Sequence, residues 1–95
     1  MQNLNFYNVS ITKSDNSNQV VVKGDIENNS GRNYNAVAIR IILFIRSIPI
    51  TSTVVVVNGL MNGRTKSFDK YVEDLEFDKV GKDITRYEIY AESAY

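Results

Sequence analysis

The chain has 95 residues, of which 43% are hydrophobic and 23% are charged, and its eleven basic residues balance its eleven acidic ones. This length supports one hydrophobic core, so we expect a single domain over residues 1–95. The ordinary composition excludes a disordered chain, and the zero net charge favours neither nucleic acid nor an anionic membrane as a partner. Histidine, cysteine and tryptophan are absent from the sequence, which removes the usual general base, the thiol nucleophile, soft metal ligands and disulfides.

Alternating apolar and polar residues predict two strands in the first third of the chain. Residues 5–13 form the first strand, and the alternation changes phase at Tyr7-Asn8, which indicates a β-bulge of the kind that edge strands often carry. A polar turn leads to the second strand, residues 19–28. One of its faces is apolar and consists of Val20, Val22, Gly24 and Ile26. We therefore expect that face in the core and the other in water.

The longest strand is predicted over residues 34–46. Its aliphatic residues share one parity and are Val37, Ile39, Ile41, Leu43 and Ile45. Pro49 marks a corner, after which residues 50–57 return antiparallel as a hairpin partner. Two Asn-Gly pairs, Asn58-Gly59 and Asn62-Gly63, then predict tight turns.

Residues 64–72 and 85–92 carry two further strands. The segment between them, residues 73–83, fits a short strand, a helical turn or a loop across a sheet edge. Six strands are therefore expected, with a seventh if this segment adds one. The spacing of the turns predicts an all-β fold, an antiparallel immunoglobulin-like β-sandwich of about seven strands.

The polar side of the long strand carries an unexpected apolar pair. Ile42 and Phe44 lie between Arg40 and Arg46 at the parity that should face water. Exposed apolar patches with a charged rim mark association surfaces. These four residues are therefore our candidate interaction surface.

Two interpretations of this apolar pair remain open. In the first, a protein partner or a second copy of the chain covers the pair, and Val55 or Val57 lies beside it if the hairpin register allows. In the second, apolar side chains from the segment 73–83 cover the pair within one molecule. The side chains available for this are Leu75, Phe77 and Val80.

The residue types offer little for catalysis or metal binding. The acidic run between residues 69 and 78 lacks the spacing of a calcium loop, and lysines close to it neutralise part of its charge. We interpret this run as a solvated surface, and we assign no catalytic, cofactor-binding or metal-binding residues. Residues 41–45 form the longest apolar stretch, which is too short to insert across a membrane.

The tyrosines suggest a second function, from a different class. A small-ligand or carbohydrate binder could use Tyr34, Tyr87 and Tyr90 near the loop end of the sandwich, because aromatic rings can stack on ligands. The competing explanation is structural. Tyrosine suits strands, since its ring packs while its hydroxyl stays in water.

Three stretches of the chain share a pattern with a known family. Residues 22–31 read Val-Lys-Gly-Asp-Ile-Glu-Asn-Asn-Ser-Gly, the long strand includes Leu43-Phe44, and residues 59–68 contain a Leu-x-x-Gly turn followed by Phe68. This order resembles the bacterial FxLYD domain family and its immunoglobulin-like relatives. In the naming motif, Ile41, Leu43, Phe44 and Ile45 stand where the family has phenylalanine, leucine, tyrosine and aspartate.

The resemblance gives each shared residue a structural role. Gly24 permits close backbone approach, Gly31 and Gly63 permit positive φ, and Leu60 and Phe68 fill the core. The resemblance also implies an extracytoplasmic, envelope-associated protein without a defined reaction. The first residues lack the basic start and apolar run of a signal peptide, so a cytoplasmic location stays open.

These observations favour a non-catalytic interaction or spacer module. It would bind a protein partner or itself through the apolar strand face or through a sheet edge. No cofactor, nucleic acid or direct membrane insertion is expected, and any small ligand remains unknown.

Overall fold

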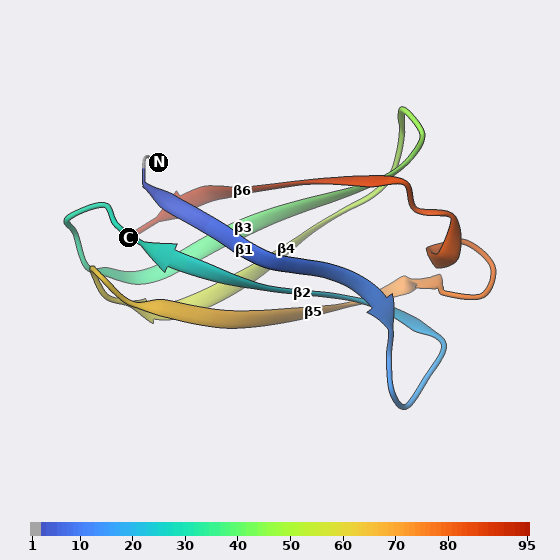
Figure 1. Cartoon of the computed structure of the whole chain (residues 1–95), viewed down its shortest axis with the longest axis horizontal. Helices are drawn as coiled ribbons and strands as arrows, with labels where there is room; N and C mark the ends of the chain where they lie inside the picture. The colour runs from blue at the N-terminus through green and yellow to red at the C-terminus, as the bar shows by residue number, and fades with distance from the viewer. Residues whose placement is uncertain (1–2) are drawn as a thin grey trace.

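The computed structural model describes residues 3–95, which form six β-strands and a short 3₁₀ helix. The elements are β1 (Leu4–Lys13), β2 (Gln19–Asn28), β3 (Tyr34–Ile45), β4 (Ile48–Leu60), β5 (Thr65–Glu76), η1 (Gly81–Asp83) and β6 (Arg86–Ala94). Sheet A has the strand order β1-β2-β5 and sheet B has the order β4-β3-β6, and all pairs are antiparallel. The strands of both sheets run along the long axis of the molecule (Figure 1). The expected all-β architecture of antiparallel sheets is confirmed.

The segment 73–83 adds no seventh strand, so the expected count of about seven is wrong for residues 3–95, which hold six. Its first residues extend β5 to Glu76, and the chain then turns into η1. Phe77 and Val80, together with Ile84 just beyond the segment, pack against the core, and a Cβ at position 81 would lie 2.5 Å from Cγ2 of Val20, so this position needs glycine. The segment therefore closes one end of the sandwich. No helix among residues 3–95 is long and apolar enough to cross a bilayer.

The central strands β2 and β3 supply the most deeply buried side chains. On β3 four of the five residues predicted to face inward are fully buried, namely Val37, Ile39, Ile41 and Leu43, whereas Ile45 at the end of the strand is half-buried. A central strand has a neighbour on each side and a second sheet in front, so its inward side chains lose contact with water. Each such side chain contributes roughly 1.5–3 kcal/mol to folding. From β5, Phe68, Val72 and Leu75 complete the core.

The predicted bulge in β1 is present. The pairing with β2 shifts between Tyr7 and Ser10, and Asn8 adopts a φ of 56°. Opposite this region, a Cβ on Gly24 would lie 2.8 Å from Cζ of Phe68 and 3.2 Å from Cγ2 of Val9. Gly24 therefore permits the close approach that the sequence suggested, and it leaves room for the Phe68 ring.

The two Asn-Gly pairs have different roles. Asn62-Gly63 forms the predicted turn, whereas Asn58-Gly59 lies inside β4, which continues to Leu60. The prediction of a tight turn at Asn58-Gly59 is therefore wrong. Gly59 has a φ of 65°, a left-handed conformation within the strand. Nearby, Nζ of Lys66 donates to the carbonyl oxygen of Asn58 at 2.7 Å, which links β5 to the edge of β4.

Asn28 is fully buried and fastens two loops at one end of the sandwich. Its Nδ2 donates to the carbonyl oxygens of Arg32 at 2.7 Å and Leu60 at 3.0 Å. Its Oδ1 accepts from the backbone nitrogen of Ser30 at 3.0 Å and from Oγ of Ser30 at 2.6 Å. A buried amide is tolerated only when its polar atoms are satisfied in this way. This geometry explains the asparagine of the 22–31 motif, for which the sequence alone gave no reason.

Candidate interaction surface on sheet B

The structure brings three of the four predicted surface residues together. Arg40, Ile42 and Phe44 lie on the outer face of β3, the parity opposite to the buried Ile41 and its neighbours. Arg46 lies beyond the end of β3 in the turn to β4, with a φ of 58°. Its backbone nitrogen donates to Oγ1 of Thr85 at 2.6 Å. The predicted charged rim is therefore split, since Arg40 lies on the sheet and Arg46 in a turn.

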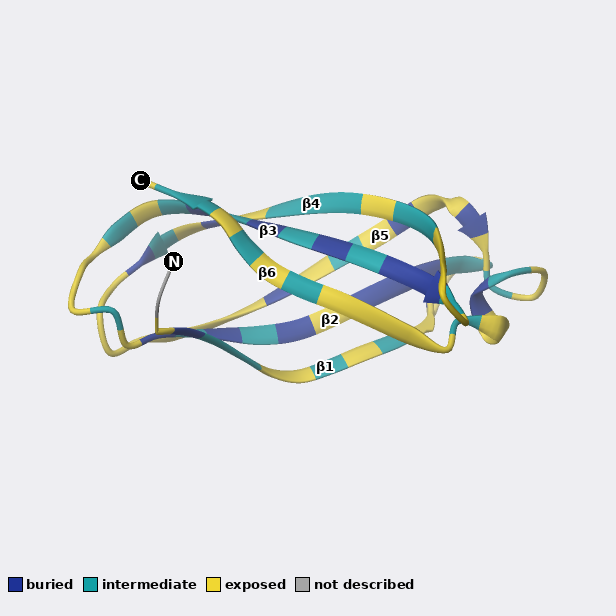
Figure 2. Cartoon of the chain, turned by 90° about the horizontal axis from the view of Figure 1, so that it is seen from above, coloured by how far each residue is buried: buried dark blue, intermediate teal, exposed yellow. Residues whose placement is uncertain are grey.

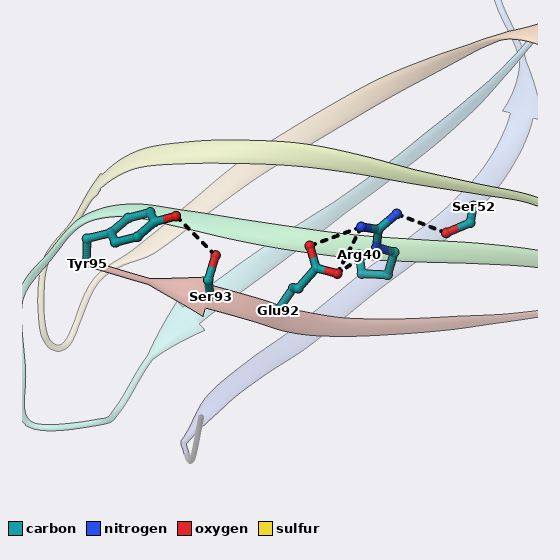
Figure 3. A network of polar contacts seen from close by, with 5 residues as sticks. All are labelled: Arg40, Ser52, Glu92, Ser93 and Tyr95. Atoms are coloured by element: carbon teal, nitrogen blue, oxygen red, sulfur yellow. Dashed lines mark hydrogen bonds and ion pairs between the residues drawn. The ribbon is translucent and has the colours of Figure 1, made fainter.

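Arg40 joins all three strands of sheet B (Figure 3). Its Nε and Nη2 donate to Oε1 and Oε2 of Glu92 on β6 at 3.0 and 3.1 Å, and its Nη1 donates to Oγ of Ser52 on β4 at 3.0 Å. This two-pronged contact matches the planar guanidinium to the carboxylate. The arginine is therefore already satisfied within the molecule, and its aliphatic stem lies on the sheet.

Phe44 is covered by a residue that the sequence analysis did not consider for this site. The carbon Cζ of Arg86 lies 3.8 Å from the centre of the Phe44 ring, and Nη1 of Arg86 contacts Oε2 of Glu88 at 3.2 Å. Phe44 is only 7% exposed as a result. A guanidinium over an aromatic face is attracted by the ring electrons. Leu75 belongs to the core instead, so the predicted internal cover from 73–83 is not what shields Phe44.

The valines that join this face are Val54 and Val56. The register pairs Val54 with Arg40 and Val56 with Ala38, whereas Val55 and Val57 pair with the inward residues of β3. The expectation that Val55 or Val57 lies beside Ile42 is therefore wrong. The hairpin turn fixes this register, and a shift of one residue exchanges the two faces of a strand.

An apolar surface remains exposed on the outside of sheet B. Val56 is 54% exposed and Tyr90, which pairs with Arg40, is 45% exposed. Ile42 and Val54 are half-buried beside them. We name this surface the sheet B face and define it by Arg40, Ile42, Val54, Val56 and Tyr90. The alternation within the last strand could have placed Tyr90 outside, but only the pairing of β6 with β3 brings it to Arg40.

The three tyrosines proposed for ligand stacking do not meet. Tyr34 starts β3 and pairs with Leu60, at one end of sheet B. Tyr87 pairs with Leu43 towards the other end, and Tyr90 lies on the outer face between them. A ligand platform needs its rings on one surface. These three residues therefore form no common site.

The outer face of sheet A is polar instead. Asp25 accepts from Nδ2 of Asn8 at 2.9 Å and from Oγ of Ser67 at 2.6 Å, and these hydrogen bonds lower the pKa of its carboxyl group. At the same face, the negative charge of Glu27 raises the pKa of Tyr7, whose hydroxyl donates to it at 3.2 Å. Side-chain partners within the sheet therefore satisfy these groups. Residues 3–95 hold no cluster of three or more acidic side chains suited to a metal ion.

The two long sides of the sandwich differ in how well they are sealed. On the side of β4 and β5, which make the main backbone contact between the sheets, the inward residues Val57, Phe68 and Val72 are buried. On the side of β1 and β6 most inward apolar residues are only half-buried (Figure 2). They are Phe6, Val9 and Ile11 on β1 and Ile89, Ala91 and Ala94 on β6. We call these the closed side and the open side.

Comparison of the chain with protein-family models finds no match, and no curated protein or solved structure matches it significantly. The function is therefore argued from the geometry of the sheet B face and of the sheet edges.

Proposed function

We propose that this chain is a non-catalytic protein-interaction module that binds a partner or a second copy of itself through sheet B. The observation that carries this proposal is the exposed sheet B face, where Val56 and Tyr90 stand in water around the satisfied ion pair of Arg40 and Glu92. Aliphatic and aromatic side chains around a fixed arginine are the composition of protein interfaces. Because Arg40 already has partners, burial of this face would leave no unpaired charge.

The surface chemistry supports a module without catalysis. Two stretches match the S-x-x-K spacing of some serine hydrolases, Ser10 to Lys13 and Ser67 to Lys70. Both lie on strands, where residues three apart point to opposite faces, so the lysine side chain is directed away from the serine hydroxyl. The hollows along the described surface are open and have linings at least half polar, unlike the enclosed, mostly apolar pockets of small-molecule sites.

The strand order supports the finer fold assignment that we propose, an immunoglobulin-like sandwich of the FxLYD type. The chain crosses between sheets from β2 to β3, from β4 to β5 and from β5 to β6, a path that such sandwiches share. The roles of Gly24, Asn28 and Phe68 agree with the shared motif. By the same resemblance we propose a bacterial, envelope-associated setting.

A matched pair of tyrosines tests the proposed surface. Tyr90 on sheet B and Tyr71 on sheet A are each 45% exposed, so Tyr90→Asp and Tyr71→Asp add the same charge at equally exposed positions. Solution mass measured by light scattering over a concentration series should show self-association that Tyr90→Asp removes and Tyr71→Asp retains. Equal behaviour of the two variants would argue against the sheet B face.

Photo-crosslinking extends this test to partners other than the chain itself. A benzoylphenylalanine placed at position 90 or 71 should give adducts in producing cells at position 90 and few at 71, and the adduct mass separates a second copy from another protein. The same adducts at both positions, or none at either, would contradict an interaction role for sheet B.

A further inference from the structure

The open side leaves β6 with a free edge. Among residues 3–95, β6 pairs with β3 alone, whereas the inward side chains of Ile89, Ala91 and Ala94 are only half-buried. A strand with unpaired backbone groups beside a half-buried apolar row has both features that an added strand would satisfy.

We infer that the strand that covers this edge is β6 of a second copy, paired antiparallel about a two-fold axis at Ile89. This inference rests on the proposed function and specifies its partner. The dimer would join two three-stranded sheets into one continuous sheet of six strands, with the order β4-β3-β6 followed by its symmetric repeat.

Symmetry limits the registers that two copies of β6 can adopt. Directly opposite residues in an antiparallel pair share one face of the sheet, and a two-fold axis perpendicular to the sheet preserves that face. The axis must therefore pass at a residue, and near the middle of β6 the choices are Glu88, Ile89 and Tyr90.

Charge selects one of these three registers. An axis at Glu88 places Glu88 opposite its own copy, and an axis at Tyr90 places Glu88 opposite Glu92 of the second copy. Both put like charges face to face, which destabilises a pair of strands. An axis at Ile89 instead places Arg86 opposite Glu92 of the second copy, twice by symmetry. The side chains of Arg86 and Glu92 are 50% and 39% exposed. Glu92 would keep its contact with Arg40 and lie between that arginine and Arg86 of the second copy.

The same register matches the other side chains. Ile89 meets its own copy, Tyr87 meets the smaller Ala91, and the hydroxyl-bearing Tyr90 lies opposite Glu88. On the inner face, these contacts would continue the apolar row of the open side. On the outer face, they would extend the sheet B face across the dimer.

The other exposed edges are less suited to this pairing. The bulge at Asn8 interrupts the middle of the β1 ladder, and bulges hinder edge-to-edge pairing. The register shift of β6 lies at Glu92, at the end of the segment 86–92 that the dimer would pair. Lys66 reaches a backbone oxygen at the edge of β4, and β4 has no charged residue between Ile48 and Leu60 that would select a register. β5 is also an edge strand with charges of both signs, but it lies against β4 on the closed side. Among the described edge strands, β6 therefore combines an edge on the open side with charges that are complementary under two-fold symmetry.

Two opposite charge reversals test the register directly. Arg86→Glu alone would place two glutamates opposite each other at both ends of the pair, and Glu92→Arg alone would do the same with arginines. Each variant should dimerise at least about tenfold more weakly than the unmodified chain. In an equimolar mixture both contacts become complementary, so heterodimers should form with an affinity within about threefold of the original. Arg64→Glu, an exposed reversal outside β6, serves as the control and should leave dimerisation unchanged.

Hydrogen exchange of the unmodified chain gives a second, independent test. Amide protection in β6 should rise with protein concentration, whereas protection in β4 should stay constant. Failure of the mixed variants to form heterodimers, or protection of β6 that does not depend on concentration, would overturn the inference. If Tyr90→Asp still differs from Tyr71→Asp in association or crosslinking, the proposed function stands and only this partner and register are lost. If the two tyrosine positions also behave alike, both fail.

Discussion

The closed and open sides of the sandwich use similar side chains but bury them to different extents. Phe6 on β1 and Phe68 on β5 form an edge-to-face pair, with ring centres 6.4 Å apart and planes at 86°. Phe68 belongs to the closed side and is buried, whereas Phe6 belongs to the open side and is half-buried. The two rings are chemically identical and contact each other, so residue type does not explain the difference. It follows from which edge strand the second sheet approaches.

The comparison shows which side of the sandwich contributes most to folding stability and which side keeps apolar surface available for association. On the closed side, β4 and β5 approach each other, and Val57, Phe68 and Val72 are buried, while Val55 on β4 is half-buried. On the open side, β1 and β6 leave part of the apolar row in water. Apolar area that stays wet contributes little to folding but is available to association.

Replacement of each of the paired phenylalanines by alanine tests the difference between the two sides, and it should have the largest effect on stability. Phe68→Ala is expected to lower the free energy of unfolding by about 3–5 kcal/mol, because it leaves a cavity in a buried site. Phe6→Ala removes the same ring from a half-wet site and should cost roughly half as much. Urea unfolding of the two variants measures this difference. Equal losses would show that the open side is as well sealed in solution as the closed side.

Replacement of Asn28 tests the contribution of the loops at the end of the sandwich where this residue lies, which the closed and open sides share. Asn28→Ala removes the side-chain hydrogen bonds to Ser30, Arg32 and Leu60 and leaves buried carbonyl oxygens without a donor. The expected loss of unfolding free energy is about 1–3 kcal/mol. Hydrogen exchange should then quicken in the loops at this end of both sheets, while the contrast between β1 and β5 persists. A loss confined to one side would mean that the loops, not the strands, create the difference.

Replacement of Asp25 should have the smallest effect on stability. This residue lies on β2 and accepts hydrogen bonds from Asn8 on β1, at the open side, and from Ser67 on β5, at the closed side. Its hydrogen bonds to Asn8 and Ser67 favour the carboxylate, so its pKa is lower in the folded state than in the unfolded state. The stabilisation is therefore fully present above the unfolded pKa and is lost as the pH falls through the lower, folded pKa. Asp25→Asn should remove this part of the acid dependence, with a small loss of stability near neutral pH and little change at low pH, where the stabilisation is already absent. NMR titration of the carboxyl group gives the folded pKa directly, and a value at or above the ordinary one would refute this assignment.

Much of the fold was readable from residue patterns. The bounds of β2 matched the predicted 19–28, the bulge at Tyr7-Asn8 was visible as a change of phase, and the aliphatic parity of β3 identified the core. These features follow from local rules, because a strand alternates its faces and a bulge shifts that alternation. The turn at Asn58-Gly59 was predicted wrongly because an Asn-Gly pair favours left-handed backbone wherever it occurs, and cross-strand pairing in β4 absorbed it.

The candidate surface was harder to predict, because it depends on residues far apart in the sequence. Arg40, Ile42 and Phe44 share a face of β3 through their parity alone. Whether Phe44 is exposed depended on Arg86, forty-two positions later in the chain, and whether Arg40 is free depended on Glu92. No local pattern encodes such contacts.

The sequence by itself determined most of the strand segments, the apolar parity of the central strands, and the glycines that a turn or a close contact requires at positions 24 and 63. These properties depend on the backbone and on immediate neighbours. The tertiary structure alone decided that β6 joins β3, that Val54 and Val56 face outward, and that the side of β1 and β6 stays open. The physical reason is that register and the choice of neighbour are set by the joint burial of two whole sheets, to which each residue contributes only a small part.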